Sequence, residues 1–153
     1  MPHARSIDPA FAALPLHKLA DAALTRAREL GATHADLRVE RIRSQHLRLR
    51  DASLEGRLDD QDTGFAVRVV HEGTWGFAAG VDLTPEAAVR VAEQAVAIAR
   101  TTKPVNREPV ELADEPVHAG VSWISAYDVD PFSVPDADKV ALLAERSARL
   151  LAA

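Results

Sequence analysis

The chain has 153 residues, the length of one ordinary domain, and its hydrophobic content of 47% is sufficient for a sizeable core. Its net charge of −5 argues against a general nucleic-acid binder, which needs a basic excess to neutralise phosphates. Cysteine is absent, which excludes disulfides, thiolate metal sites and a cysteine nucleophile.

Residues 1–15 are interpreted as an N-terminal arm, and they lack the apolar core of a signal peptide. No later run approaches the ~20 apolar residues that cross a bilayer, so we predict a cytoplasmic protein. From Leu16 to Leu30 apolar residues recur every three or four positions, which predicts a helix. Pro15 suits its first position and Gly31 the left-handed residue past its end. His17 lies off the apolar stripe and is interpreted as a surface histidine.

After this helix the hydrophobic period changes to two. Leu37 and Val39 alternate with polar residues, and Leu47 and Leu49 do the same, which predicts two half-buried strands joined at residues 43–45. Turn-forming residues fill the segment 51–64, with a short apolar alternation that leaves room for a third, weaker strand.

The stretch HEGTWGF begins at His71 and opens like the zinc motif HExxH. Trp75 stands where the second His belongs, and Gly76 stands at the position that the longer HExxxH spacing requires. A glycine at position 73 suits a tight hairpin turn between two strands, so we predict a hairpin here instead of a metal-binding helix. Alternation assigns Trp75 and Phe77 to the same core face as Val67; a binding platform is the alternative.

A second helix is predicted to begin at Thr84 as N-cap and to run to about Arg100. Its expected buried residues are Ala88, Val91, Ala92, Ala95, Ile98 and Ala99. Four prolines then interrupt residues 103–134 and Pro135 follows them, so we interpret this segment as a linker with short extended pieces around residues 110–112 and 121–124. A last helix is predicted over residues 135–151, within a final segment 135–153.

The last helix resembles the first one in sequence. Lys18, Ala23 and Leu30 recur 121 positions later as Lys139, Ala144 and Leu151. Alanine-rich helices match by chance easily, so the start of a truncated internal repeat is one of two interpretations. The predicted fold is therefore α+β, with an antiparallel meander sheet of four to five strands packed against two long helices in residues 16–102, followed by the linker and the C-terminal helix.

Candidate catalytic and metal-binding residues are not evident in this sequence. The six histidines lack a His or Cys at ligand spacing: His3, His17, His34, His46, His71 and His118. His34 and Asp36 are interpreted as polar residues of a loop that leaves the first helix. The segment around Ser122 lacks the second glycine of a nucleophile elbow. We therefore predict no catalytic, cofactor-binding or metal-ligating residue.

A run of arginines is followed closely by acidic residues. The arginines are Arg38, Arg41, Arg43, Arg48 and Arg50, and the acids are Glu55, Asp59, Asp60 and Asp62. If successive strands are antiparallel, the two sets pair across the sheet at exposed positions. The alternative is that Arg48 and Arg50 face a partner subunit or an acidic peptide.

The order of these motifs resembles the N-terminal region of the TldD/PmbA family, once called modulators of DNA gyrase and better described as metallopeptidases. The most specific pieces are "DTGFAVRVV", "GTWGFAAGVDLTPEAA" and "YDVDPFSVPDADKVALL". The resemblance covers nearly the whole chain from Leu16. The Trp-Gly-Phe-Ala run is closer to the TldD-like branch than to the PmbA-like branch.

The resemblance implies a longer, dimeric zinc peptidase whose HExxxH motif lies beyond these residues, so no family ligand maps onto this sequence. It implies a non-catalytic, chamber-forming domain that is inactive alone, with the rest of its own polypeptide, an identical or paralogous subunit and a peptide substrate as partners. The alternatives are a self-contained protein-interaction module and a PmbA-like non-catalytic partner subunit. A nucleic-acid binder is the weakest alternative.

Overall fold

The computed structural model describes residues 7–152, and their contacts divide the chain into two compact units. Unit 1 comprises the residues up to Arg41 together with Thr63–Ser122, and unit 2 comprises Ile42–Asp62 and the residues from Trp123 onward. The β1–β2 hairpin contributes to both units. Every buried residue belongs to unit 1, and no described residue of unit 2 is buried. Unit 1 therefore holds the hydrophobic core.

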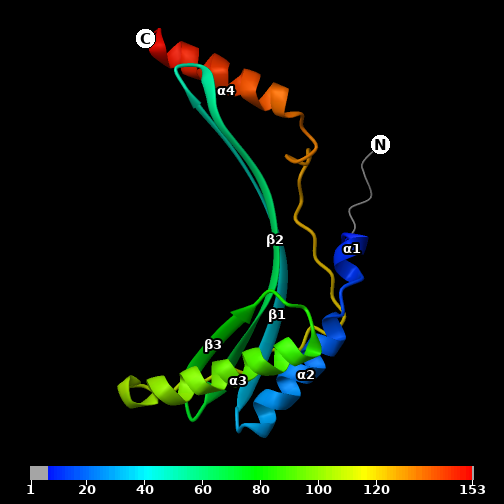
Figure 1. Cartoon of the computed structure of the whole chain (residues 1–153), viewed down its shortest axis with the longest axis vertical. Coiled ribbons are helices and arrows are strands. Elements are labelled where there is room, and N and C mark those ends of the chain that lie inside the picture. The colour runs from blue at the N-terminus through cyan, green and yellow to red at the C-terminus, as the bar shows by residue number, and fades with distance from the viewer. Residues whose placement is uncertain (1–6, 153) are drawn as a thin grey trace. The chain divides into compact units, whose positions relative to one another are not determined.

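The sheet is a three-stranded antiparallel meander of β1 (His34–Arg50), β2 (Ser53–His71) and β3 (Thr74–Gly80), in the order β1-β2-β3 (Figure 1). Two residues join each pair of strands. Asp51 and Ala52 have φ of 48° and 62°, and Glu72 and Gly73 have φ of 48° and 73°. Two successive positive φ angles define the turn whose twist matches that of antiparallel strands. The hairpin predicted at Glu72-Gly73 is confirmed.

The expected number of four to five strands was wrong. Residues 43–45, predicted as a connection, lie inside β1, and the predicted weaker strand around Leu54 and Leu58 is part of β2. The actual reversal is at Asp51-Ala52, a pair without glycine at the very start of the segment 51–64 in which turn-forming residues were noted. Hydrogen bonding to a long antiparallel neighbour keeps the polar stretches extended, so local turn propensity is overridden.

Two helices of unit 1 match the predicted positions closely: α2 (Leu16–Glu29) and α3 (Pro85–Thr102). Gly31 has a φ of 89° just past α2, as predicted, although Pro15 is the N-cap residue and not the first helical one. The N-cap Thr84 accepts a hydrogen bond from the Ala87 backbone N–H through its hydroxyl at 3.3 Å. Ile98 was expected in the core but is 43% exposed.

Helix α3 packs directly on the small residues of β3. A Cβ atom added to Gly76 would lie 1.9 Å from the Ala95 carbonyl oxygen, so only glycine fits at this position. One added to Gly80 would lie 3.1 Å from the Val91 side chain. The core forms where α2 and α3 cover one face of the sheet, and it includes Leu19, Ala23, Ala27, Phe65, Val67, Val69, Ala78, Val91, Ala92, Ala95, Val96 and Ala99.

The register of the second hairpin corrects the predicted placement of Trp75 and Phe77. Val69 is opposite Gly76 and Val67 is opposite Ala78. Directly opposite residues share one face of an antiparallel sheet, so the core face of β3 carries Gly76 and Ala78. Trp75 and Phe77 therefore point to the other face, where they are 36% and 57% exposed. The prediction that Trp75 and Phe77 lie in the core was wrong, because alternation defines two faces of a strand without showing which face the helices cover.

The remaining elements are short or exposed. Helix α1 (Pro9–Ala12) lies in the arm, and a 3₁₀ turn, η1 (Lys103–Val105), follows α3. No strand occurs between residues 106 and 135, so the expected extended pieces do not join the sheet. Helix α4 (Asp136–Leu151) confirms the predicted last helix. Within residues 7–152, no helix has the length and apolar character that crossing a membrane requires.

Candidate functional site

The outer face of the sheet in unit 1, opposite the helices, carries an aromatic and charged cluster. We define the outer-face cluster as His34, Asp36, Arg68 and Trp75. The Arg68 guanidinium carbon lies 4.7 Å from the centroid of the Trp75 ring, and Arg68 Nε donates to Asp36 Oδ2 at 2.9 Å. His34 Nε2 is 3.2 Å from the same oxygen, and its ring meets Trp75 edge-on at 6.2 Å.

The three strands of unit 1 together position these side chains. His34 and Asp36 begin β1, Arg68 is in β2 and Trp75 is in β3. Phe77, directly opposite Arg68, extends the aromatic surface beside the cluster. The pairing of His34 with Asp36 had been interpreted as loop polarity, but both residues lie in a strand. Stacking of a cation on an indole and a charged hydrogen bond hold Arg68 in place on this face of the sheet.

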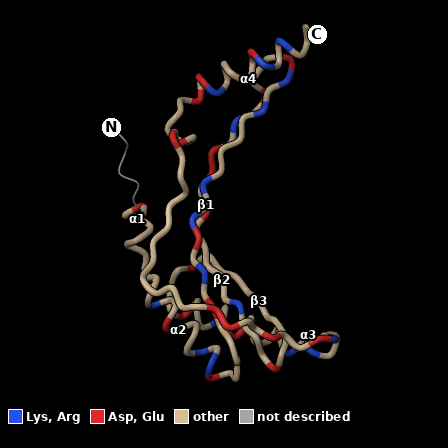
Figure 2. The backbone as a smooth tube through the Cα atoms, turned by 180° about the vertical axis from the view of Figure 1, so that it is seen from behind, with Lys and Arg blue, Asp and Glu red and all other residues tan. Residues whose placement is uncertain are grey.

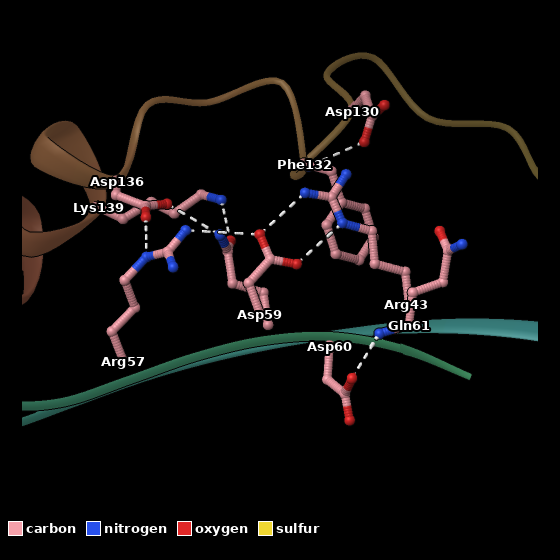
Figure 3. Close-up of polar contacts among 10 residues, drawn as sticks. Arg43, Arg57, Asp59, Asp60, Gln61, Asp130, Phe132, Asp136 and Lys139 are labelled. Atoms are coloured by element: carbon pink, nitrogen blue, oxygen red, sulfur yellow. Dashed lines mark hydrogen bonds and ion pairs between the residues drawn. The ribbon is translucent and has the colours of Figure 1, made fainter.

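A second polar cluster lies within unit 2 (Figure 3). We define this hairpin cluster as Arg43, Gln45, Arg57, Asp59, Asp136 and Lys139. Arg43 donates to Asp59 through Nε at 3.0 Å and Nη2 at 2.9 Å, and its guanidinium carbon lies 4.7 Å from the Phe132 ring centroid. Arg57 Nε donates to Asp136 Oδ2 and its Nη2 lies 3.5 Å from Asp59 Oδ2. These contacts join β1, β2 and the start of α4.

Two further residues complete the hairpin cluster. Gln45 donates its amide N–H to Asp136 Oδ1 at 2.8 Å, and Lys139 Nζ donates to Gln45 Oε1. At the hairpin turn, the Ala52 backbone N–H donates to the Ser147 hydroxyl at 3.0 Å. Helix α4 is thus held to the hairpin by polar contacts, while its side chains remain unburied.

The hairpin cluster lowers the pKa of both of its carboxylates. A hydrogen bond from Arg43 lowers the pKa of Asp59, and a hydrogen bond from Arg57 lowers the pKa of Asp136. The same bonds raise the pKa of Arg43 and the pKa of Arg57. Both carboxylates therefore stay ionised and paired, which describes a structural network and not a proton-transferring acid.

The predicted pairing of arginines with acidic residues across the sheet is confirmed for Arg43, Arg48 and Arg50, whereas Arg38 pairs with Glu40 of its own strand. Besides the Arg43–Asp59 pair, Arg48 Nε lies 3.3 Å from Glu55 and Arg50 Nη1 lies 3.5 Å from the same carboxylate. Figure 2 shows basic and acidic residues interleaved along β1 and β2. Arg41 pairs instead with Asp8 of the arm at 2.8 Å. Sequence reasoning did not identify Arg57, Gln45 or Asp136, because their contacts link positions far apart in the chain.

His71, the last residue of β2 before the turn, is buried. Its side chain is 8% exposed, and its Nε2 accepts a hydrogen bond from Arg100 Nε at 3.4 Å. An arginine only donates, so the ring proton is on Nδ1, which has no partner among the described atoms. Arg100 also donates to the Leu30 carbonyl at 2.8 Å. Arg100 therefore links α3, the end of α2 and the end of β2.

A shallow groove of about 690 Å³ lies between α2 and α3. Arg26 Nη2 and Glu93 form an ion pair there at 2.8 Å, and the Glu93 bond raises the pKa of Arg26. This contact joins α2 to α3 across the groove.

The described residues do not form a metal site. Within residues 7–152, no group of three or more His, Asp or Glu side chains converges in a way that would hold an ion. His17, His46 and His118 are exposed, as expected for His17, and His3 lies outside the described residues. His34 has one carboxylate neighbour, Asp36, which also accepts from Arg68. The donor set therefore does not fit a catalytic zinc ion, which needs three protein ligands.

Part of the chain matches a known protein family. Residues 35–99 match the family model described as PmbA/TldA metallopeptidase domain 1. The matched residues run from β1 through β2 and β3 to most of α3. No curated protein matches the chain. The family match supports the resemblance identified from the sequence motifs.

Proposed function

We propose that this chain belongs to the PmbA/TldD family and serves as the first, non-catalytic domain of a metallopeptidase of that family. The observation that carries this proposal is the match of residues 35–99 to domain 1 of the family. The match includes the sheet and α3, the elements that build most of the core of unit 1. A role as scaffold agrees with this location, since the matched residues include most of the packed core.

The chemistry implied by the family would be supplied from outside these residues. Zinc, where it is bound in a PmbA/TldD peptidase, activates water for peptide hydrolysis. The described residues lack a fitting ligand set, so we assign them no step of that reaction. Their proposed part is to position the polypeptide that carries HExxxH and to build the wall of a chamber for peptides or unfolded segments. We place this activity in the cytoplasm.

Assignment to the TldD-like branch is a finer part of the proposal. It rests on the Trp-Gly-Phe-Ala run at residues 75–78. The structure gives the alternation in this run a physical role. Gly76 and Ala78 allow α3 to approach, while Trp75 and Phe77 occupy the outer face.

A second candidate function is a protein-interaction module, and one observation favours it. Trp75 and Phe77 are surface residues beside the ordered Arg68, and this arrangement is typical of a binding platform. The two functions are compatible in one molecule, because a scaffold domain also needs contacts with its partners.

The test compares this chain with a polypeptide extended by the coding sequence that follows it in the gene. We expect HExxxH in the extension, stoichiometric zinc and peptide cleavage in the extended protein, and neither property in residues 1–153 alone. Substituting the first His of that motif is the matched control. A downstream sequence without HExxxH would restrict the proposal to a PmbA-like partner subunit. Chelator-sensitive cleavage by residues 1–153 alone would contradict the non-catalytic role.

A further inference from the structure

We propose that β3 pairs with β3 of a second copy of this chain, antiparallel and about a two-fold axis at Phe77. Pairing of this kind would join the two sheets of unit 1 into one continuous sheet. The proposal deepens the scaffold role proposed above, on which its biological meaning rests, while the pairing itself follows from the geometry of β3.

The hydrogen-bonding groups of β3 that face away from β2 belong to three residues. His71 and Thr74 flank a two-residue turn and therefore form a hydrogen-bonded pair. Such pairs alternate along an antiparallel ladder, so Gly76, Ala78 and Gly80 bond to β2. The backbone N–H and C=O groups of Trp75, Phe77 and Ala79 consequently point to the outer edge. No other strand pairs with that edge within residues 7–152.

β3 lacks the features that protect an edge strand from pairing. The sequence TWGFAAG contains no charged residue and no proline, and Figure 2 shows no Lys, Arg, Asp or Glu along it. The opposite edge of the sheet is different, because β1 carries Asp36, Arg38, Glu40 and Arg41 in unit 1. Charged residues on an edge oppose pairing with another strand. β3 is therefore the edge that accepts a partner.

The register that satisfies the outer groups is self-complementary. With the axis at Phe77, Trp75 is opposite the partner's Ala79, Phe77 is opposite the partner's Phe77, and Ala79 is opposite the partner's Trp75. All three are residues whose backbone groups point outward, so each pair exchanges two hydrogen bonds. A shift by one residue would set outward groups against groups already bonded to β2.

A second copy fits this edge better than a foreign peptide does. Two uncharged strands meet without like-charge repulsion, and each contributes the same three outward-facing residues. The Phe77 side chain, 57% exposed in one chain, would lie beside its symmetry mate. A two-fold contact is also closed, since it uses one β3 edge from each copy and leaves the charged β1 edges at the two ends.

Disulfide cross-linking tests the predicted register. The chain contains no cysteine, so a single introduced thiol gives an unambiguous product. Hydrogen-bonded partners in an antiparallel ladder have Cα atoms about 5.5 Å apart, within the range of roughly 4.4–6.8 Å that a disulfide spans. We expect Phe77→Cys to form a covalent dimer under mild oxidation. Leu58→Cys, at a site that is 55% exposed, is the matched control and should cross-link far less.

Light scattering of the full chain tests the pairing itself. Phe77→Lys places two like charges opposite each other and should weaken the dimer at least about tenfold, and Phe77→Glu should do the same. Mixing the two variants should restore a dimer, because residue 77 would then meet an opposite charge. Leu58→Lys should leave the dimer unchanged.

Three results on self-association would overturn the proposal. They are a wild-type chain that is monomeric at every accessible concentration, a dimer that Phe77→Lys leaves intact, and oligomers that grow beyond a dimer. Binding of an added extended peptide by a chain that does not self-associate would also overturn it. Zinc content and peptide cleavage are measured separately, so a failure here is distinguishable from a failure of the proposed function.

Discussion

The close approach of α3 to Gly76 of β3 allows a direct test of how this helix packs on the sheet. A Cβ atom at position 76 would lie 1.9 Å from the Ala95 carbonyl oxygen and 2.9 Å from the Ala99 Cβ atom. Cβ contacts under 3.0 Å essentially do not occur, so α3 would have to withdraw by at least 1.1 Å, the difference between 3.0 and 1.9 Å. A backbone oxygen cannot move by changing a rotamer. The added Cβ atom would therefore displace the whole helix.

The cost of Gly76→Ala follows from what α3 buries. Seven of its residues are buried, among them Val91, Val96 and Ala99. A radial gap of about 1 Å forfeits up to about half of the van der Waals attraction at each contact. Overpacking a well-filled core costs about 1–3 kcal/mol, and a clash with backbone belongs at the upper end. We expect Gly76→Ala to lower the free energy of unfolding by about 3 kcal/mol or to prevent folding.

Urea unfolding followed by circular dichroism measures this change, with Gly56→Ala as the matched control. Gly56 also lies in a strand, but an added Cβ meets no atom within 4 Å. Its replacement should leave stability unchanged or raise it by up to about 1 kcal/mol. If the unfolding free energies of the Gly76→Ala and Gly56→Ala variants differed by less than about 0.5 kcal/mol, the close packing of α3 on β3 would be refuted.

Three further predictions concern pH, a helix cap and a buried hydrogen bond. The lowered pKa values of Asp59 and Asp136 stabilise the folded state above the ordinary carboxylate pKa, and this contribution is lost as the pH falls through the lower folded values. Hydrogen exchange in α4 should therefore retain its protection from about pH 7 to about pH 5 and lose it below about pH 4. Thr84→Ala should cost about 1 kcal/mol of unfolding free energy, because it removes the N-cap of α3. Arg100→Met should cost about 1–2 kcal/mol, because it leaves the buried His71 ring without its donor.

Matched substitutions on α3 serve as controls for the last two predictions. Thr101 donates its hydroxyl only to the Ala97 carbonyl within the helix, so Thr101→Ala should change stability by less than about 0.5 kcal/mol. Arg90 lies 3.9 Å from Asp82 in an exposed pair, so Arg90→Met should be nearly neutral. Equal losses in a variant and its control would contradict the roles assigned to Thr84 and Arg100. Exchange in α4 that is independent of pH would contradict the role of the carboxylates.

Local chemistry made several elements predictable from the sequence. Thr84-Pro85 marks the start of α3, Gly31 marks the end of α2, and Glu72-Gly73 marks a hairpin, because each depends on residues adjacent in the chain. The first hairpin was not predictable in the same way. Ala52 adopts a φ of 62° without being glycine, and the turn is recognisable only once the two long strands are paired.

The faces of the sheet and the polar clusters required tertiary information. In β3, small and aromatic residues alternate, and α3 covers the small ones. The sequence alone does not show that Gly76 and Gly80 face the helix. The Gln45–Asp136 contact links residues 91 positions apart, so no local spacing indicates it. Candidate functional residues were thus partly identified from sequence: Trp75 as an alternative platform, but Arg68 not at all.

The most direct test of the non-catalytic role is the zinc content of the purified chain. The chain is loaded with excess zinc, passed through gel filtration and analysed by elemental mass spectrometry. Because the described residues bring no three ligands together, we predict far less than one zinc per chain after filtration. About one retained zinc per chain, lost in a histidine variant, would contradict the account and place metal chemistry within these residues.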